Sequence, residues 1–212
     1  MKRTACILSM AIAFASSMAL AEEPKLDALL VYGEGFWFSV KEPPGWTGDT
    51  EHAGDIRANV VFRRSSKRVE DVDGLIRVRI NEKVDEDTAA DLQADMDGYR
   101  QKFPKVQFEP FDVPHPNYRV LSKLFFVPGD FFEYVVYLNP GPGAPWLFSV
   151  SMSKEKERAT AEELAAFRQV VASIVYLPSV TPTGHGRTRN SIRSATERAA
   201  LWLRRSVRRP VR

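Results

Sequence analysis

Cysteine is almost absent from this sequence of 212 residues, whose single cysteine is Cys6. We expect Cys6 to be lost with an N-terminal signal segment, so the remaining chain has none. Such a chain forms no disulfide bond and offers no thiol nucleophile, no thiolate ligand for zinc and no ligand for an iron–sulfur cluster. Beyond that segment no apolar run reaches the roughly 20 residues of a membrane-spanning helix. The core must therefore hold by burial and hydrogen bonding.

Histidine is scarce as well, and His52, His115 and His185 stand far apart in loop-like segments. A zinc site takes its ligands at short spacing, such as i and i+4 on one helix, and none of the three has a paired ligand nearby. We expect three independent loop histidines and no bound metal.

Other motifs of chemistry are missing or broken. The sequence contains no Gly-x-Ser-x-Gly nucleophile turn and no glycine-rich phosphate fingerprint. Residues 71–82 have the length of a calcium loop, but Leu75 and Ile76 stand where a ligand and a glycine are required. Carboxylate pairs such as Glu162-Glu163 stand at expected helix N-termini, where the helix dipole stabilises negative charge. The sequence thus predicts no catalytic residue and no cofactor.

The N-terminal residues have the pattern of a targeting signal. Met1-Lys2-Arg3 is positively charged, an uncharged apolar run extends from Ala5 to Ala15, and Ala19-Leu20-Ala21 has the small-x-small form of a cleavage site. This arrangement is typical of a secretory signal peptide. We predict a signal peptide over residues 1–21, cleavage between Ala21 and Glu22, and a mature protein that is periplasmic or secreted.

Alternating and β-prone runs predict a sheet. The clearest run extends from Leu75 to Ile80, where apolar residues face one way and two arginines face the other. Pro128-Gly129-Asp130 predicts a hairpin between two of the later strands. The other expected strands cover residues 35–40, 59–63, 106–111, 118–127, 131–138 and 146–152.

Two apolar stripes with helical spacing predict helices between and after these strands. The first follows a cap at Asp87 or Thr88 and consists of Leu92, Met96, Tyr99 and Phe103. The second follows a capping box formed by Thr160 and Glu163 and consists of Leu164, Phe167, Val171 and Ile174. Phe36-Trp37-Phe38 places large rings on both faces of one strand, so either helices cover both faces or Trp37 lies in a groove. We expect helices to bury both faces.

The order strands, helix, strands, helix predicts an α+β fold, an antiparallel sheet of about six to seven strands flanked by helices. The aromatic strand at residues 35–40, the following Pro44-Gly45-Trp46, the middle helix, the meander and the closing segment Phe167–Leu177 resemble the PsbP-like fold family over about residues 30–178. This resemblance implies a sandwich domain that acts as a non-catalytic binding or assembly module. It carries no functional residue over to this chain.

Charge is divided unevenly along the chain. Residues 22–183 carry 19 Lys+Arg and 26 Asp+Glu, whereas residues 184–212 carry nine Arg and one Glu. We interpret the chain as an α+β domain over residues 22–178, a flexible linker over 179–190 and an Arg-rich amphipathic tail over 191–212.

The tail is the functional segment that the sequence predicts most directly. Its apolar residues form one stripe on a helical wheel and its arginines fill the rest, which is typical of a helix lying on an anionic membrane surface. A solvated tail without a role is the competing interpretation. The residues predicted to contact a membrane or partner are Trp202, Leu203, Arg204, Arg205, Arg208 and Arg209.

These observations predict an exported, non-catalytic binding or assembly module of the cell envelope, with an envelope protein as partner. Its basic tail would hold it near an anionic membrane, and nucleic acid is not expected as a partner of an exported protein. Two alternatives stay open at this point: a peripheral envelope hydrolase or transferase built from distant residues, and a carrier of a small ligand.

Overall fold

The computed structural model describes residues 28–65, 73–83, 86 and 88–178. The expected signal peptide, linker and tail lie outside the described residues. No helix in these described ranges is long and apolar enough to cross a membrane.

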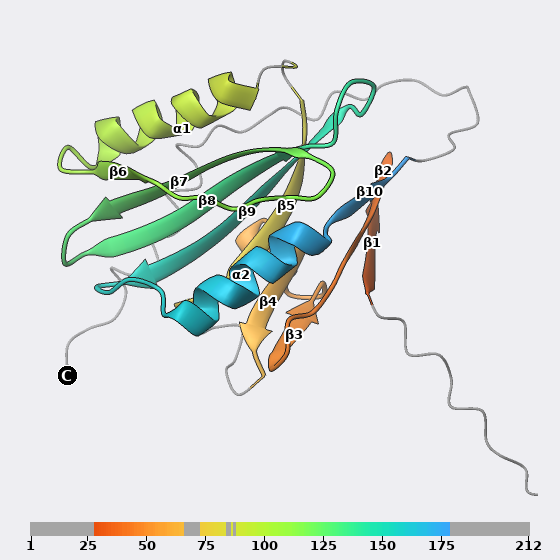
Figure 1. Cartoon of the computed structure of the whole chain (residues 1–212), viewed down its shortest axis with the longest axis horizontal. Helices are drawn as coiled ribbons and strands as arrows, with labels where there is room; N and C mark the ends of the chain where they lie inside the picture. Colours follow the sequence, from red (N-terminus) through yellow and green to blue (C-terminus); the bar gives the residue numbers. More distant parts are fainter. Residues whose placement is uncertain (1–27, 66–72, 84–85, 87, 179–212) are drawn as a thin grey trace, which may run out of the picture.

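The main element is a seven-stranded antiparallel sheet in the order β3-β4-β5-β9-β8-β7-β6 (Figure 1). It contains every strand predicted from the sequence except the first, and adds β3, which begins at Trp46. The bounds are β3 Trp46–Asp49, β4 Val60–Arg64, β5 Ile76–Glu82, β6 Gln107–Pro110, β7 Arg119–Val127, β8 Phe131–Asn139 and β9 Trp146–Glu155.

Local sequence patterns account for the centre of this sheet. In β5, Ile76, Val78 and Ile80 are buried and the two arginines point to the other face, as their alternation predicts. The predicted hairpin joins β7 to β8, with Val127 opposite Phe131 across the turn. The tight turn between these strands requires a positive φ at Gly129. Its φ is +78, a value that glycine adopts without strain.

A second, three-stranded antiparallel sheet was not predicted. It consists of β1 Leu29–Gly33, β2 Phe36–Val40 and β10 Val175–Leu177, with β2 in the centre. The predicted antiparallel sheet of about six to seven strands is confirmed as the seven-stranded sheet. The strand now labelled β2 was expected in that sheet, and this placement is wrong. The small sheet was missed because β1 and β10 come from opposite ends of the domain and are only five and three residues long.

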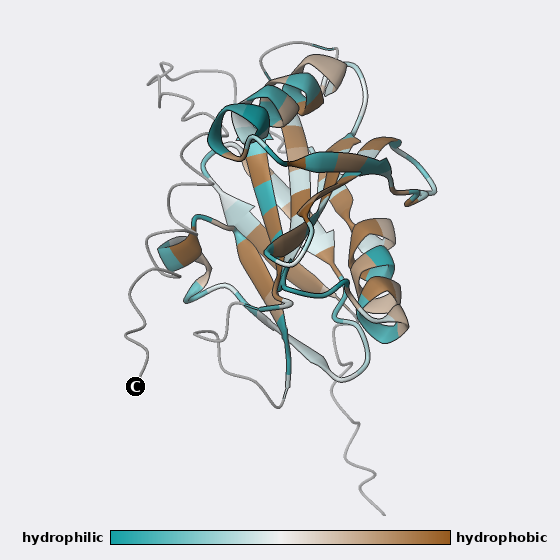
Figure 2. Ribbon diagram, turned by 90° about the vertical axis from the view of Figure 1, so that its left-hand side faces the viewer, coloured by the Kyte–Doolittle hydropathy of each residue, from teal (hydrophilic) through white to brown (hydrophobic). Residues whose placement is uncertain are grey.

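The two helices cover opposite faces of the large sheet. Figure 1 shows α1, Thr88–Lys102, on one side, and α2, Ala161–Ser173, on the side that also carries the small sheet. Figure 2 shows that α1 is the more polar helix, whereas α2 presents more apolar residues to the sheet. A short 3-10 helix, η1 Ala53–Ile56, lies beside β4, where Ala53 packs with Val61.

The main core lies between the large sheet, α2 and the inner face of the small sheet. Phe148 of β9, Phe38 of β2 and Phe167 of α2 are all fully buried there. The predicted helix stripes are confirmed in both helices. Phe167 and Val171 of α2 are fully buried in the main core, and Tyr99 of α1 is buried in a smaller hydrophobic cluster between α1 and the large sheet. The closed α+β architecture is therefore held by burial, as a cysteine-free domain requires.

Candidate binding surface

The predicted contact residues of the tail, Trp202 to Arg209, lie outside the described residues, and so does His185. The two histidines that are described stand in loops, as expected. His52 Nδ1 lies 2.9 Å from Asp49 Oδ2, and the hydrogen bond with this carboxylate raises the pKa of the histidine. Over the described residues, no group of His, Cys, Asp and Glu has the arrangement of a metal site.

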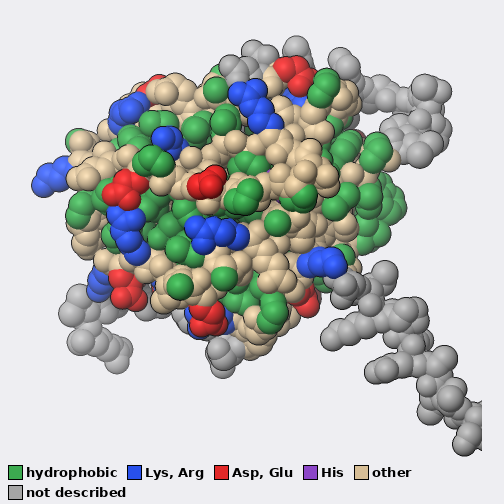
Figure 3. All heavy atoms as spheres, viewed as in Figure 1, with side chains coloured by type: hydrophobic (Ala, Val, Ile, Leu, Met, Phe, Trp, Pro, Cys, Tyr) green, Lys and Arg blue, Asp and Glu red, His purple; other side chains and the backbone are tan. Residues whose placement is uncertain are grey.

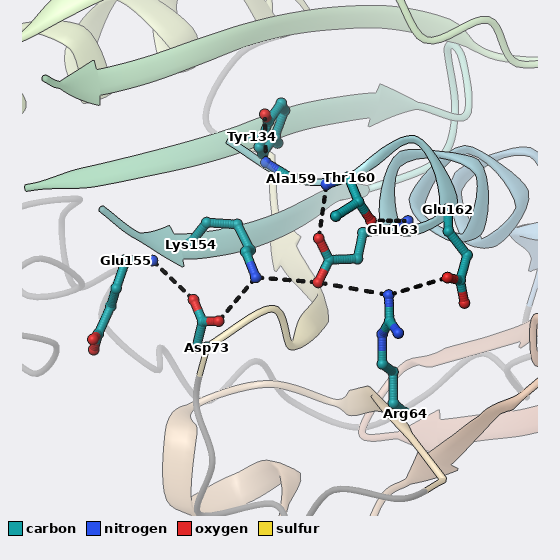
Figure 4. A network of polar contacts seen from close by, with 9 residues as sticks. All are labelled: Arg64, Asp73, Tyr134, Lys154, Glu155, Ala159, Thr160, Glu162 and Glu163. Atoms are coloured by element: carbon teal, nitrogen blue, oxygen red, sulfur yellow. Dashed lines mark hydrogen bonds and ion pairs between the residues drawn. The ribbon is translucent and has the colours of Figure 1, made fainter. Parts of the chain in front are cut away.

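The predicted capping box at the start of α2 is confirmed and belongs to a larger buried network (Figure 4). Glu163 accepts from the backbone of Thr160 at 2.8 Å and from Lys154 Nζ at 3.1 Å. Lys154 also bonds to Asp73 Oδ2 at 2.8 Å, so one ammonium group sits between two carboxylates. The network ties α2 to β9 and to the turn before β5.

This network is structural in its chemistry. Burial would raise the pKa of Glu163, but hydrogen bonds from Thr160 and Lys154 outweigh it and the pKa is lowered, so the carboxylate stays ionised. Burial would lower the pKa of Lys154, but its hydrogen bonds to Asp73 and Glu163 outweigh burial and the pKa is raised. A general acid or base needs a pKa near the working pH, and these shifts move both groups away from it.

A second polar cluster lies under α1. Tyr99 donates a hydrogen bond to Glu133 on β8, and Tyr137 on β8 donates one to Asp95 of α1. Arg77 Nη2 of β5 lies 3.6 Å from Glu133 Oε1. Burial, followed by the charge of Glu133, raises the pKa of the Tyr99 phenol well above its usual value, so it stays protonated and acts as a donor. The cluster braces a helix that has few buried apolar residues.

The candidate site is the outer face of the small sheet. We use the term outer face for the five large apolar side chains on this surface together with Ser39. The apolar members are Leu30, Tyr32, Trp37, Val175 and Leu177, and they are the exposed large hydrophobic residues of the described chain.

The strand register places these side chains in two rows. Leu30 and Val175 flank Ser39, while Tyr32 and Leu177 flank Trp37. The Tyr32 and Trp37 rings lie 5.5 Å apart between centroids, and these side chains are 71% and 44% exposed. Hydrophobic side chains gather at the right-hand edge of the molecule in Figure 3, where Figure 1 places this sheet. These side chains form one exposed apolar patch on a face of the small sheet.

The expectation that helices cover both faces of the Phe36-Trp37-Phe38 strand is wrong for Trp37. Phe36 and Phe38 point into the core, where α2 and the large sheet bury them. No described helix or strand covers the opposite face, because α2 and the large sheet pack on the side of Phe36 and Phe38, and β2 pairs only with β1 and β10.

The other four apolar members of this face were not predicted from the sequence. For β1 the usable signal was a short apolar run, Leu29–Tyr32, that ends at a glycine. The run does not alternate with polar residues, so it could not show that Val31 is buried while Leu30 and Tyr32 are exposed. No comparable signal existed for β10, whose three residues follow α2 after one residue and resemble the end of its apolar stripe.

Comparison with known proteins adds a likeness of fold. No protein-family model and no curated protein matches the chain. Among solved structures it resembles the solution structure of cyanobacterial PsbP (CyanoP) from Synechocystis sp. PCC 6803, with a TM-score of 0.42 and 19% sequence identity. The match covers 76% of this chain and 99% of that chain. The PsbP-like resemblance seen in the sequence is thus present in the structure, as a weak likeness of fold that transfers no functional residue.

Proposed function

We propose that this chain is an exported, non-catalytic binding or assembly module that docks an envelope protein through the outer face. The observation that carries the proposal is the exposure of five large apolar side chains on one flat sheet surface. Burying such side chains is favourable by roughly 25 cal/mol per Å² of apolar surface, so leaving them in water is costly unless a partner covers them.

The composition of the surface favours a protein as occupant. Trp and Tyr are the residue types that most often dominate binding energy at protein interfaces, and Trp37 and Tyr32 stand side by side here. The charged residues Glu34 and Lys41 are exposed at the two ends of β2. An apolar centre with a polar rim is the usual anatomy of a protein–protein interface.

The size of the outer face favours a small interface in which a few residues contribute most of the binding energy. A standard interface buries roughly 800 Å² on each partner, more than five partly exposed side chains supply. We therefore expect Trp37 and Tyr32 to act as the central contacts, with surrounding loops completing the contact area.

The alternatives of an envelope hydrolase or transferase and of a small-ligand carrier have less support. The titratable groups under α1 and at the start of α2 bond to one another and brace the helices. The flat outer face offers contact area to a surface and not enclosure to a small molecule.

The outer face is tested by site-specific photo-crosslinking in intact cell envelopes. A photoreactive residue in place of Tyr32 is expected to form a discrete, saturable crosslink to one envelope protein. The Trp37→Ser change is expected to weaken this crosslink about tenfold or more, since hot-spot truncation costs roughly 2 kcal/mol or more.

The matched control places the photoreactive residue at Gln101, an exposed position on α1. Equal crosslinks from Gln101, or crosslinks from Tyr32 that go only to lipid or to a second copy of this chain, would contradict the protein-docking proposal.

We also propose that the Arg-rich tail holds the module near an anionic membrane. The support is its charge of nine Arg against one Glu in residues 184–212 and its stripe of apolar residues around Trp202. Each arginine near an anionic surface contributes on the order of 1 kcal/mol, and the apolar stripe adds burial at the bilayer boundary.

The tail is tested by co-sedimentation with lipid vesicles. The mature chain is expected to sediment with anionic vesicles but not with neutral ones, with binding lost as salt screens charges beyond about 10 Å at 0.1 M. A chain ending at residue 183 is the control and is expected to stay in solution. If both chains behave alike on anionic vesicles, the tail does not bind the membrane.

A further inference from the structure

The loop between β6 and β7 is hydrogen-bonded to β10, the strand that forms one edge of the small sheet. β10 pairs with β2 on one side and meets this loop on the other. His115 Nε2 lies 3.1 Å from the carbonyl oxygen of Ile174, the residue before β10. The Tyr176 amide, in the middle of β10, donates to the Tyr118 hydroxyl at 2.8 Å. Two hydrogen bonds from one loop therefore hold the outer edge of β10.

The bonds of His115 require one protonation state. Nδ1 faces the backbone N–H groups of Asn117 at 3.1 Å and Tyr118 at 3.0 Å, and an N–H group only donates. Nδ1 must therefore be an unprotonated acceptor. Nε2 faces a carbonyl oxygen, which only accepts, so Nε2 must carry the single proton. The folded loop thus selects a neutral imidazole in one tautomer.

The ring also positions Tyr118. The His115 and Tyr118 rings stack with centroids 4.3 Å apart and planes 5° apart. Because Tyr118 supplies the hydroxyl that accepts from β10, a displaced His115 ring removes both the Ile174 bond and the support of the Tyr176 bond.

The contacts of the ring come from two segments. Its own loop supplies the stacked Tyr118 ring and the amides of Asn117 and Tyr118, and the end of α2 supplies the Ile174 carbonyl oxygen. Burial lowers the pKa of His115, partly offset by the bond to Ile174. A lowered pKa means that the folded loop disfavours the imidazolium.

We infer that His115 is a pH-sensitive latch for the outer face: its protonation opens the loop, frees β10 and withdraws Val175 and Leu177 from the docking surface. The link is short, because these two residues flank Tyr176 and are opposite Ser39 and Trp37 in the register. This inference rests on the proposed function for its biological meaning, but the latch itself is a property of the free protein.

The direction of the effect follows from linkage. A histidine with a lowered pKa in the folded state stabilises the fold fully above its ordinary value of 6.5. That stabilisation declines as the pH falls below 6.5 and the more basic unfolded or opened state takes up the proton. β10 is therefore expected to open more often in mild acid than at neutral pH.

The test is hydrogen exchange of the Tyr176 amide, measured by NMR on the whole mature protein. Its protection factor, which already corrects for intrinsic exchange, is expected to fall about tenfold between about pH 7.5 and about pH 5, as for the loss of one or two hydrogen bonds. His115→Asn removes the titration, while its Oδ1 can still accept from the two backbone amides as in an Asx turn. The fall is expected to disappear in this variant.

His52→Asn is the matched control, because His52 is an exposed histidine between β3 and η1 and its hydrogen-bond partner is Asp49. It is expected to keep the wild-type fall in protection. The latch proposal is contradicted if the protection factor of the Tyr176 amide does not fall in the wild-type protein, or if it falls equally in His115→Asn.

The same crosslinking reaction separates the latch from the proposed function. With the photoreactive residue at Tyr32, the crosslink is expected to be weaker at about pH 5 than at about pH 7.5. A crosslink that keeps its full strength in acid while the protection of Tyr176 falls would show that the latch does not control the surface. A crosslink absent at both pH values, with Tyr176 behaving as expected, would reject the docking function and leave the latch standing.

Discussion

Phe148→Ala is expected to lower the free energy of unfolding by about 3–5 kcal/mol, the usual cost of removing a buried phenylalanine ring. Phe148 is fully buried on β9, in the centre of the large sheet. Its ring meets Phe38 of the small sheet edge-on, with centroids 5.1 Å apart, and lies 6.5 Å from the Tyr176 ring. The truncation therefore leaves a cavity at the contact between the two sheets. Chemical denaturation measures the change.

Tyr32→Ala is the matched control for this prediction. It removes a similar ring from the outer face of the small sheet, where the side chain is mostly exposed, and is expected to cost less than about 1 kcal/mol. A loss below about 1 kcal/mol for Phe148→Ala would mean that the inner face of the sheet is wrongly assigned.

Lys154→Met is expected to destabilise the fold by about 3 kcal/mol, because it removes the nearer of the two cations that face the buried Glu163 carboxylate and leaves only Arg64 Nη2, 3.8 Å from Oε1. The Lys154 and Glu163 side chains are each 6% exposed, and Nζ bonds to both Glu163 and Asp73. Methionine keeps most of the volume of lysine, so the loss measured by denaturation reports the charge and hydrogen bonds.

The double change Lys154→Met with Glu163→Gln is the control. Glutamine can keep the reciprocal capping contact with Thr160 but carries no charge. The double variant is therefore expected to be more stable than Lys154→Met alone, through a coupling of roughly 0.5–3 kcal/mol. If adding Glu163→Gln only destabilises further, the buried charge is not the source of the effect.

The pH dependence of stability provides an independent check on this pair. The lowered pKa of Glu163 means that its contribution is complete above its ordinary value of 4.5 and is lost as the pH falls through the folded value. The raised pKa of Lys154 means that its contribution is complete below 10.5 and is lost as the pH rises through the folded value. Lys154→Met is expected to remove the alkaline part of this profile.

The sequence by itself determined the elements whose cause lies within a few residues. The alternation around Ile76, the turn at Gly129 and the capping contact between Thr160 and Glu163 all depend on neighbours in the chain, and the structure confirms each of them. The order of these elements was enough to predict an α+β fold with an antiparallel sheet.

Only the tertiary structure decided how distant segments meet. β1 and β10 are short, and each becomes a strand because it pairs with β2, a contact that for β10 spans most of the domain. Lys154 looks like an ordinary surface lysine at a strand end until the fold places it between Asp73 and Glu163. His115 looks like an isolated loop histidine until the loop reaches Ile174.

The candidate site shows the same division most clearly. The sequence shows that Trp37 and its neighbours alternate across a strand, but not which face of that strand the rest of the chain covers. That outcome depends on where α2 and the large sheet pack, and they pack on the side of Phe36 and Phe38. Local patterns set which side chains share a face, whereas the burial of that face is a long-range contact, so the exposure of Trp37 could be decided only by the assembled fold.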